Sequence, residues 1–186
     1  MSDPVSALNG ANFDGFANIR EIGPLGMISL RCDLAEKALP AVVKSIVGTK
    51  LPAPRRIEMK DGSGAGWMSP DEMLFVLPYN KVAKALETIE KKLNGTHHLT
   101  VDVSDARAVF RIEGPMAKEV LMKLAPVDFT ALAPGELRRT RVAQVAAAFW
   151  QDGPGFTLVS FRSVAGYVMG LLEHSAQPSS ALHLRG

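Results

Sequence analysis

Hydrophobic residues recur along the chain with two different periods, and the changes between them predict the order of the elements. Alternation at every second position, typical of a strand with one buried face, occurs over residues 98–103 and 107–112. Spacings of three and four residues, typical of amphipathic helices, occur over residues 33–47, 80–94, 115–124 and 163–173. Short runs rich in apolar residues predict further strands at 27–31, 57–59, 66–68, 73–77, 142–150 and 156–161.

Residues that favour turns and helix ends support these boundaries. Asp33 followed by Glu36 resembles a capping box, although Pro40 must kink this helix or delay its start. Asn80 and Gly95 are a suitable cap and stop for the second helix. The sequence DGSG predicts a turn after residue 60, QDGPG predicts another after residue 150, and residues 126–139 are expected to form a loop.

This order of elements predicts an α+β protein. We expect a largely antiparallel sheet with helices on one face, in which two ferredoxin-like units share a core, although the sequence itself shows no internal repeat. Residues 1–26 show little periodicity and contain scattered turn formers, among them Gly10, Gly15, Gly23, Pro24 and Gly26, which predict a flexible N-terminal arm that could settle on a partner. Residues 27–173 are expected to form a single α+β domain, and residues 174–186 a polar C-terminal tail.

Composition narrows the class of protein. With 186 residues, 47% of them hydrophobic and 22% charged, the chain can bury a core and is not of the disordered type. The net charge of +2 is spread evenly along the chain, which argues against nucleic-acid binding. No apolar run approaches the length of a membrane span and no secretory signal is visible. One cysteine excludes a disulfide framework within the chain, so we expect a cytoplasmic protein.

Few residues suggest metal or nucleophile chemistry. His97 and His98 are consecutive on a predicted strand and would point to opposite faces, so no metal site is expected there. His174 and His183 lie in the polar tail, and all four histidines are expected to be solvated or hydrogen-bonded. Cys32 could be activated by a helix start, but its position fits a packed, inert thiol. The glycines of DGSGAGW precede no helix, so they indicate a turn rather than a phosphate loop.

Two groups of carboxylates are candidates for acid–base chemistry. Asp102 and Asp105 flank Ser104, and Asp71 is followed by Glu72. Such groups can act as general acids or bases when a cleft desolvates them. In turns, however, they more often accept hydrogen bonds from nearby backbone and side-chain groups.

Arginines and aromatic residues near the C-terminus are the candidate contact residues. Arg138, Arg139 and Arg141 form a cationic strip. Their guanidinium groups are either solvated or bind carboxylates of a partner protein. Aromatic residues and arginine are enriched at the centres of protein interfaces. The candidate subunit interface therefore comprises Arg138, Arg139, Arg141, Trp150, Phe161 and Arg162. Trp150 and Trp67 could equally be buried in the core.

Three segments carry a resemblance to a known family. They are GWMSPDEMLFVLP (66–78), DVSDARAVFRIEGPMAKEVL (102–121) and the pair ELRRTRVAQVAAAFW and FTLVSFRSVAGYVMGLL (136–172). In order and spacing they resemble the gamma subunit of heterotetrameric sarcosine oxidase, and the likeness covers about residues 27–172. The family is in turn distantly similar to the folate-binding fold of aminomethyltransferases, of which this chain would be a fragment.

The resemblance implies a role inside an assembly with alpha, beta and delta subunits. That complex oxidises sarcosine to glycine and passes the one-carbon unit to tetrahydrofolate, and its FAD, FMN, NAD and folate are implied to lie on other subunits. This chain itself would then be non-catalytic and would bind no cofactor alone. The residues agree, because no dinucleotide fingerprint, metal cluster or poised nucleophile is visible in the sequence.

Two alternatives remain open. One is a self-standing folate-dependent one-carbon transferase, although such enzymes resemble a chain about twice as long. The other is a folate-binding protein of the same superfamily with a sensing or repair role, for which a reactive exposed cysteine in a recognisable motif would be expected. Cys32 alone does not provide that motif.

Overall fold

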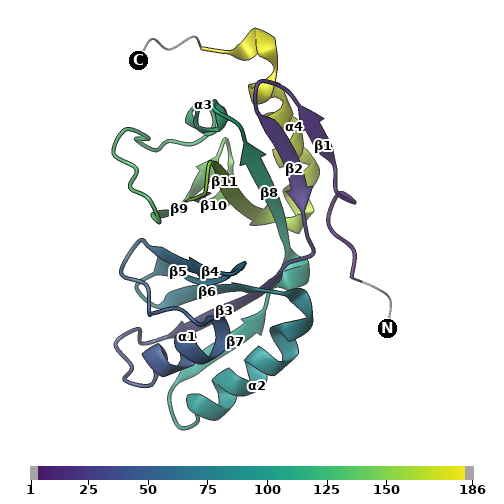
Figure 1. The fold of residues 1–186 in the computed structure, drawn as a ribbon. Coiled ribbons are helices and arrows are strands. Elements are labelled where there is room, and N and C mark those ends of the chain that lie inside the picture. Colours follow the sequence, from purple (N-terminus) through teal and green to yellow (C-terminus); the bar gives the residue numbers. More distant parts are fainter. Residues whose placement is uncertain (1–3, 183–186) are drawn as a thin grey trace. The chain divides into compact units, whose positions relative to one another are not determined.

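Two antiparallel sheets organise the chain in the computed structural model, which describes residues 4–182 (Figure 1). Contacts between Cα atoms divide it into two compact units. Unit 2 takes residues 24–105 together with 135–137, and unit 1 takes the segments before, between and after them. The predicted single domain over residues 27–173 is therefore wrong, because the chain forms two units and residues before 27 belong to one of them.

Unit 2 has the connectivity of a ferredoxin-like fold. Its five-stranded sheet has the order β4-β5-β6-β3-β7, and α1 and α2 connect β3 to the β4-β5 hairpin and β6 to β7. Without the edge strand β4 this is a βαββαβ unit in which every neighbouring pair is antiparallel. The elements are β3 (Gly26–Cys32), α1 (Leu39–Val47), β4 (Ile57–Lys60), β5 (Ser63–Ser69), β6 (Glu72–Leu77), α2 (Val82–Lys92) and β7 (His98–Asp102).

The first helix of unit 2 begins later than its capping signal suggested. Asp33 Oδ1 accepts a hydrogen bond from Ala35 N at 2.9 Å, so residues 33–36 form a turn rather than helix. Helix α1 begins at Leu39 with Pro40 in its first turn, where the missing N–H costs nothing. It ends at Gly48, whose φ of 72° suits glycine.

Unit 1 repeats the same arrangement with a different chain order. Its six-stranded sheet has the order β1-β2-β8-β11-β10-β9. In the place that β7 takes in unit 2, unit 1 uses β2 from the beginning of the chain, and β9 corresponds to β4. The elements are β1 (Asn12–Asp14), β2 (Asn18–Ile22), β8 (Arg107–Glu113), α3 (Ala117–Met122), β9 (Leu137–Val142), β10 (Val145–Asp152), β11 (Gly155–Phe161) and α4 (Ala165–Ala176).

The expected flexible arm over residues 1–26 is wrong for most of its described length. Strand β2 pairs antiparallel with β8, with Ile19 opposite Ile112, and Ile19 is fully buried. Before β1, Ser6 and Ala7 donate hydrogen bonds to the buried carboxylate of Glu21. Long-range pairing with β8 orders this segment. No local pattern predicts the strand, because β2 is short and has the polar Glu21 on the same buried face as Ile19, which breaks the alternation. Residues 1–3 lie outside the described residues.

The expected polar tail over residues 174–186 also begins too early. Helix α4 continues through Ser175 and Ala176, which are buried, and a 3₁₀ turn follows at Pro178–Ser180. The ammonium of Lys123 donates to the carbonyl oxygens of Ser175 and Ser180, each at 2.7 Å. This segment is therefore held by the residue that directly follows α3, and residues 183–186 lie outside the described part of the chain.

The residues of the predicted strand 142–150 belong to two strands and the turn between them. β9 ends at Val142 and β10 begins at Val145, with Ala143 and Gln144 as the turn. Ala143 has a φ of 49°, a conformation that glycine or asparagine normally takes in such turns. Because neither residue is a turn former, no local signal marks this hairpin, and the loop expected over residues 126–139 includes the first half of β9.

Each unit has its own buried hydrophobic cluster. In unit 2, apolar residues of β3, β5 and β6 pack against α1 and α2. In unit 1, apolar residues of β2, β8, β10 and β11 pack against α3 and α4, and the ring of Phe149 stacks on that of Phe129 at 5.4 Å between centroids. The predicted α+β class with two ferredoxin-like units is confirmed, with one cluster in each unit in place of a common core.

Candidate subunit interface and surface pockets

The arginine strip lies on β9, an edge strand of the unit 1 sheet. Arg139 and Arg141 alternate along the strand and are exposed, whereas Arg138 points to the other face and is partly buried. The strip therefore divides between two faces, because successive side chains of a strand alternate. Two guanidinium groups remain on one exposed face at the sheet edge.

Trp150 does not contribute to an outer surface. Its side chain is 1% exposed on β10, in the register position opposite Thr157 of β11. The alternative reading of this residue as core is confirmed, so we remove Trp150 from the candidate interface. A side chain with so little accessible surface has almost none left to bury against a partner.

Phe161 and Arg162 lie together at the end of β11, and β10 separates them from β9. The Phe161 ring is 48% exposed, and the guanidinium carbon of Arg107 lies 4.3 Å from its centroid in a cation–π contact. Arg162 donates to the carbonyl oxygens of Val5 and Ser6 at 2.9 and 3.1 Å. Arg162 thus binds the amino-terminal segment of its own chain, while Phe161 keeps an exposed aromatic face.

A second arginine on β8 is the centre of a polar network that sequence reasoning did not single out. Arg111 is 12% exposed and lies 3.1 Å from both Glu113 Oε1 and Asp152 Oδ2. It also donates to Thr157 Oγ1 at 3.1 Å. Hydrogen bonds from Arg20 and then Arg111 hold the pKa of Glu113 below its ordinary value. The alternation of residues 107–112 placed Arg111 on the outward face, but its partners come from other strands and could not be read locally.

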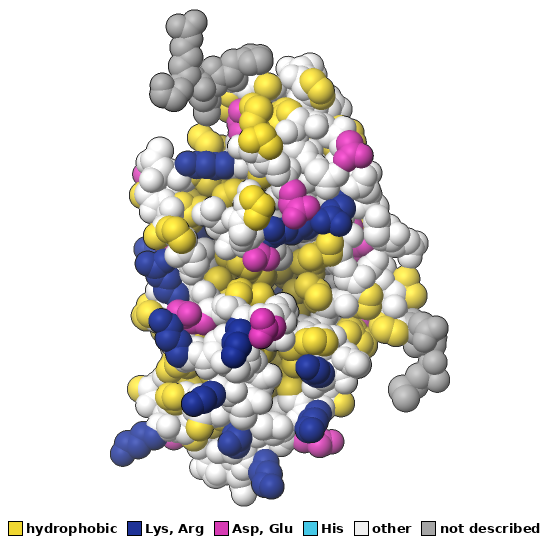
Figure 2. All heavy atoms as spheres, viewed as in Figure 1, with side chains coloured by type: hydrophobic (Ala, Val, Ile, Leu, Met, Phe, Trp, Pro, Cys, Tyr) yellow, Lys and Arg dark blue, Asp and Glu magenta, His cyan; other side chains and the backbone are white. Residues whose placement is uncertain are grey.

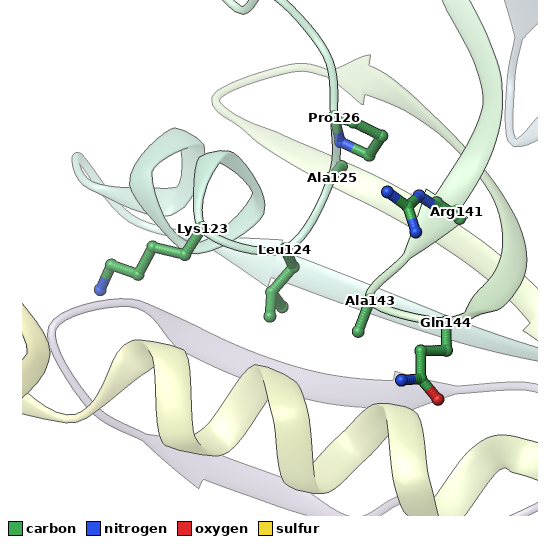
Figure 3. Close-up of a pocket in the computed structure, with 7 residues that line it drawn as sticks. All are labelled: Lys123, Leu124, Ala125, Pro126, Arg141, Ala143 and Gln144. Atoms are coloured by element: carbon green, nitrogen blue, oxygen red, sulfur yellow. The ribbon is translucent and has the colours of Figure 1, made fainter.

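One surface hollow of about 420 Å³ lies beside the arginine strip, at the turn between β9 and β10 (Figure 3). The Arg141 guanidinium lies toward Ala125 and Pro126 there, while the Lys123 side chain extends away from the other lining residues. Lys123 is already bonded to Ser175 and Ser180. The hollow therefore offers one guanidinium, the amide of Gln144 and apolar side chains, without a carboxylate or thiol for catalysis.

A second hollow of about 280 Å³ has aromatic walls. Phe129, Leu132 and Phe156 line it together with Lys118 and Gln151, which are exposed. The ring of Phe129 stands edge-on to Phe156 at 6.3 Å. This hollow can accept apolar groups, but it presents no acid–base pair and no nucleophile.

The candidate carboxylates have structural partners. Asp102 Oδ1 accepts hydrogen bonds from Ser104 N and Oγ at 2.9 and 2.5 Å, and Asp105 accepts one from Tyr79 at 3.0 Å. Glu72 binds Arg31 at 2.9 Å, and Asp71 accepts from Ser69. That hydrogen bond is the main reason why the pKa of Asp71 is lowered. The interpretation of these groups as turn and surface partners is confirmed, and acid–base work is not favoured.

Cys32 and the paired histidines also fit the structural interpretation. Burial, followed by the charges of Asp33 and Glu36, raises the pKa of the buried Cys32 thiol, which disfavours the thiolate form that a nucleophile needs. His98 Nε2 lies 3.3 Å from Glu90, while His97 is exposed. His174 is exposed on α4, and His183 lies outside the described residues.

The described residues contain neither a grouped set of metal ligands nor a helix suited to a membrane. Across residues 4–182, no three His, Cys, Asp or Glu side chains are grouped so that they could hold a metal ion. Within the same residues, no helix has both the length and the apolar character for a membrane crossing. On the face drawn in Figure 2, Lys and Arg side chains are spread among other residues rather than gathered in one basic patch.

Known proteins similar to this chain agree with one another. The family model described as "Sarcosine oxidase, gamma subunit family" matches residues 31–176. The sarcosine oxidase subunit gamma of Corynebacterium sp. (strain U-96) is 29% identical over 135 residues, which cover 68% of this chain and 65% of the relative. The subunit gamma of Arthrobacter sp. is 29% identical over 145 residues, with coverage of 75% and 69%. The match to the Corynebacterium subunit thus spans slightly less than two thirds of that protein.

Solved structures show the same fold. A chain of the heterotetrameric sarcosine oxidase from Corynebacterium sp. U-96, in complex with pyrrole 2-carboxylate, superposes with a TM-score of 0.79 at 23% identity, covering 91% of this chain and 88% of that one. The glycine cleavage system aminomethyltransferase T of Bartonella henselae superposes with a TM-score of 0.61 at 16% identity, covering 82% and 44%. Because the family model matches well over half of the residues, this chain belongs to the sarcosine oxidase gamma-subunit family.

Proposed function

We propose that this chain is a non-catalytic assembly subunit of a heterotetrameric sarcosine oxidase. The family match over residues 31–176 carries the proposal. The geometry of the described residues supports it, because the candidate carboxylates are engaged in turns and ion pairs and the single thiol is buried. In this proposal the alpha, beta and delta subunits hold the FAD, FMN, NAD and tetrahydrofolate, and the gamma chain supports oxidative demethylation of sarcosine through its contacts.

The exposed face of β9, together with Phe161, is the contact surface that we propose for another subunit. Arg139 and Arg141 offer planar guanidinium groups that suit carboxylates of a partner. Phe161 offers an aromatic ring with 48% of its surface exposed, and aromatic residues are enriched where partners meet. This surface retains three of the six residues named from the sequence as a candidate interface, namely Arg139, Arg141 and Phe161.

The proposal is tested by activity of separate and combined chains. The purified chain supplied with flavin should show no sarcosine-dependent oxygen uptake, whereas the chain co-expressed with the other three subunits should yield an active complex. Omission of the chain should lower the yield of that complex. Sarcosine oxidation by the isolated chain, or an unchanged complex without it, would contradict the assembly role.

Arg139→Glu tests the surface itself. Reversal of an interface charge should weaken co-purification with the larger subunits at least several-fold and leave the circular dichroism of the isolated chain unchanged. Lys84→Glu, an equivalent charge reversal on the exposed face of α2, is the matched control and should leave the yield unchanged. Equal yields for both variants would remove β9 from the contact surface.

The folate-dependent transferase remains the second candidate, since the fold is shared with an aminomethyltransferase. This chain corresponds to 44% of that enzyme, so it would supply only part of an equivalent enclosure. Titration of the purified chain with tetrahydrofolate in a calorimeter separates the two functions. Binding by the isolated chain would favour the transferase relationship, and no heat change would favour the assembly subunit.

A further inference from the structure

Strand β7 forms an open edge of the unit 2 sheet (Figure 1). It pairs with β3 on one side, and among the described residues no strand pairs with its other side. Val103, directly after β7, donates to Met27 O at 2.9 Å. Because antiparallel neighbours exchange hydrogen bonds at alternate residues, Leu99 and Val101 bond toward β3. The backbone groups of His98, Thr100 and Asp102 therefore face the open side.

The side chains of β7 leave this edge open to pairing with a strand of another chain. Leu99 and Val101 are 57% and 41% exposed and share one face of the strand. The other face lies toward α2, where His98 contacts Glu90. Natural edge strands usually carry lysine, proline or a bulge that prevents pairing with another chain. The sequence His-Leu-Thr-Val-Asp of β7 contains none of these, whereas the edge strand β9 has its two exposed arginines.

The sequence of β7 is complementary to itself in one antiparallel register. When two copies pair around Thr100, Leu99 lies opposite Val101 of the other copy and His98 lies opposite Asp102. No pair of like charges is created. A Leu99–Val101 pair forms on each side of the two-fold axis. In this register the three outward-facing residues of each strand exchange backbone hydrogen bonds with those of the second copy.

We propose that β7 pairs with β7 of a second copy of this chain around a two-fold axis at Thr100. The pairing would join two five-stranded sheets into one continuous sheet. A strand of five residues buries far less than the roughly 1,200 Å² of a stable interface, so the dimer is weak and depends on concentration. The proposal concerns the free chain and does not rest on the assembly role.

Cysteine pairs test the register directly. In the proposed dimer Leu99 and Val101 of the second copy form a non-hydrogen-bonded pair with Cα atoms about 4.5 Å apart, which a disulfide can span. Leu99→Cys and Val101→Cys chains with different tags, mixed under mild oxidation, should give at least about tenfold more cross-linked dimer than either variant alone. The buried Cys32 is present in every sample, so the single variants also measure its background.

Measurement of mass against concentration provides the second test. The molar mass of the wild-type chain, measured by light scattering or sedimentation, should rise with concentration. Val101→Lys should abolish this rise, because it places a charged side chain opposite Leu99 on each side of the two-fold axis. Val5→Lys, the same change at a valine that is 55% exposed in unit 1, is the matched control and should dimerise like the wild type.

Three results would overturn self-pairing. The first is a wild-type chain that stays monomeric at every concentration, and the second is equal cross-linking by mixed and single cysteine variants. The third is a monomeric wild type whose Val101→Lys variant loses co-purification with other sarcosine oxidase subunits, which would assign β7 to a strand of a different chain. None of these results bears on whether the isolated chain oxidises sarcosine, so the proposed function is judged separately.

Discussion

Glu21 shows at the scale of one residue how a buried charge orders a segment far from any active site. Its carboxylate is on β2 with 4% of the residue exposed, and it accepts hydrogen bonds from Ser6 Oγ, Ala7 N and Gly10 N at 2.8 to 2.9 Å. A carboxylate supplies acceptors only, so it can satisfy several converging donors at once. Glu21 and Arg162 therefore both hold the amino-terminal segment in place, Glu21 as acceptor and Arg162 as donor.

Glu21→Gln should destabilise the protein. The amide would present a donor toward groups that are themselves donors, and an unsatisfied buried polar group costs about 1–3 kcal/mol. The free energy of unfolding from urea titration measures the loss. Glu87→Gln, at an exposed position of α2, is the control and should change it little. Equal effects of the two substitutions would show that the three hydrogen bonds do not order the segment.

Glu113 should give unfolding a measurable pH dependence. Its pKa is lowered in the folded chain, mainly by the hydrogen bond from Arg20 and then by that from Arg111. The unfolded state consequently binds the proton more readily, so the stabilisation is complete above the pKa of an unfolded glutamate and is lost as pH falls through the lower folded pKa.

Glu113→Gln should therefore lower the free energy of unfolding at neutral pH. The difference from wild type should shrink as the pH falls below about 4.3, the ordinary value for glutamate. Urea titrations of both proteins across this range make the comparison. A difference that stays constant with pH would show that the ion pairs with Arg20 and Arg111 contribute nothing to stability.

At the scale of elements, β2 joins the beginning of the chain to the unit 1 sheet. It completes the ferredoxin-like sheet next to β8 although it lies at the other end of the chain. Its Ile19 is fully buried among residues of the unit 1 cluster. Because this pairing joins residues far apart in sequence, it carries the entropic cost of closing a long loop.

Removal of residues 1–22 should unfold unit 1 or make the chain insoluble. The deletion exposes the edge of β8 and removes Ile19 from the buried cluster. Removal of residues 1–4 alone, which leaves both strands and the Glu21 hydrogen bonds in place, should preserve the fold. Circular dichroism and a thermal melt distinguish these outcomes, and a native melt of the longer deletion would contradict the role assigned to β2.

At the scale of the whole molecule, each unit has its own buried hydrophobic cluster. A core substitution in either unit should therefore lower the stability of the chain by a similar amount. Phe75 belongs to the unit 2 cluster and Phe149 to the unit 1 cluster, and both are fully buried. Each is flanked by strands and helices of its own unit. A substitution in one cluster removes contacts from that unit alone.

Phe75→Ala and Phe149→Ala should each lower the free energy of unfolding by about 3–5 kcal/mol. Hydrogen exchange should show that amides of β3 and β6 lose protection first in the Phe75 variant. In the Phe149 variant, amides of β8 and β11 should lose it first. The same pattern of lost protection in both variants would show that the chain has a single unfolding unit.

Much of the fold was predictable wherever the signal was local. The period of Val82, Leu86 and Ile89 predicted α2, and the alternation of residues 107–112 predicted β8. The order of these elements was enough for the α+β class with ferredoxin-like units. The quoted motifs were likewise enough for the family, which the family model confirms.

The candidate site was predictable only in part. Arg139, Arg141 and Phe161 are exposed as an interface requires, but Trp150 is buried and Arg162 binds the chain's own amino-terminal segment. Residue type indicates which side chains suit an interface. Exposure depends on which strands lie beside each other, and that information is absent from the local sequence.

The sequence by itself therefore determined the elements that have a local signal, the fold class and the family, because period, turn residues and motif order are properties of neighbouring positions. Only the tertiary structure decided that β2 completes the unit 1 sheet, that Ala143 turns between two strands, and that β7 keeps an open edge. Each of these depends on hydrogen bonds and burial between residues distant in the chain. Such contacts stabilise conformations that local propensity alone does not favour.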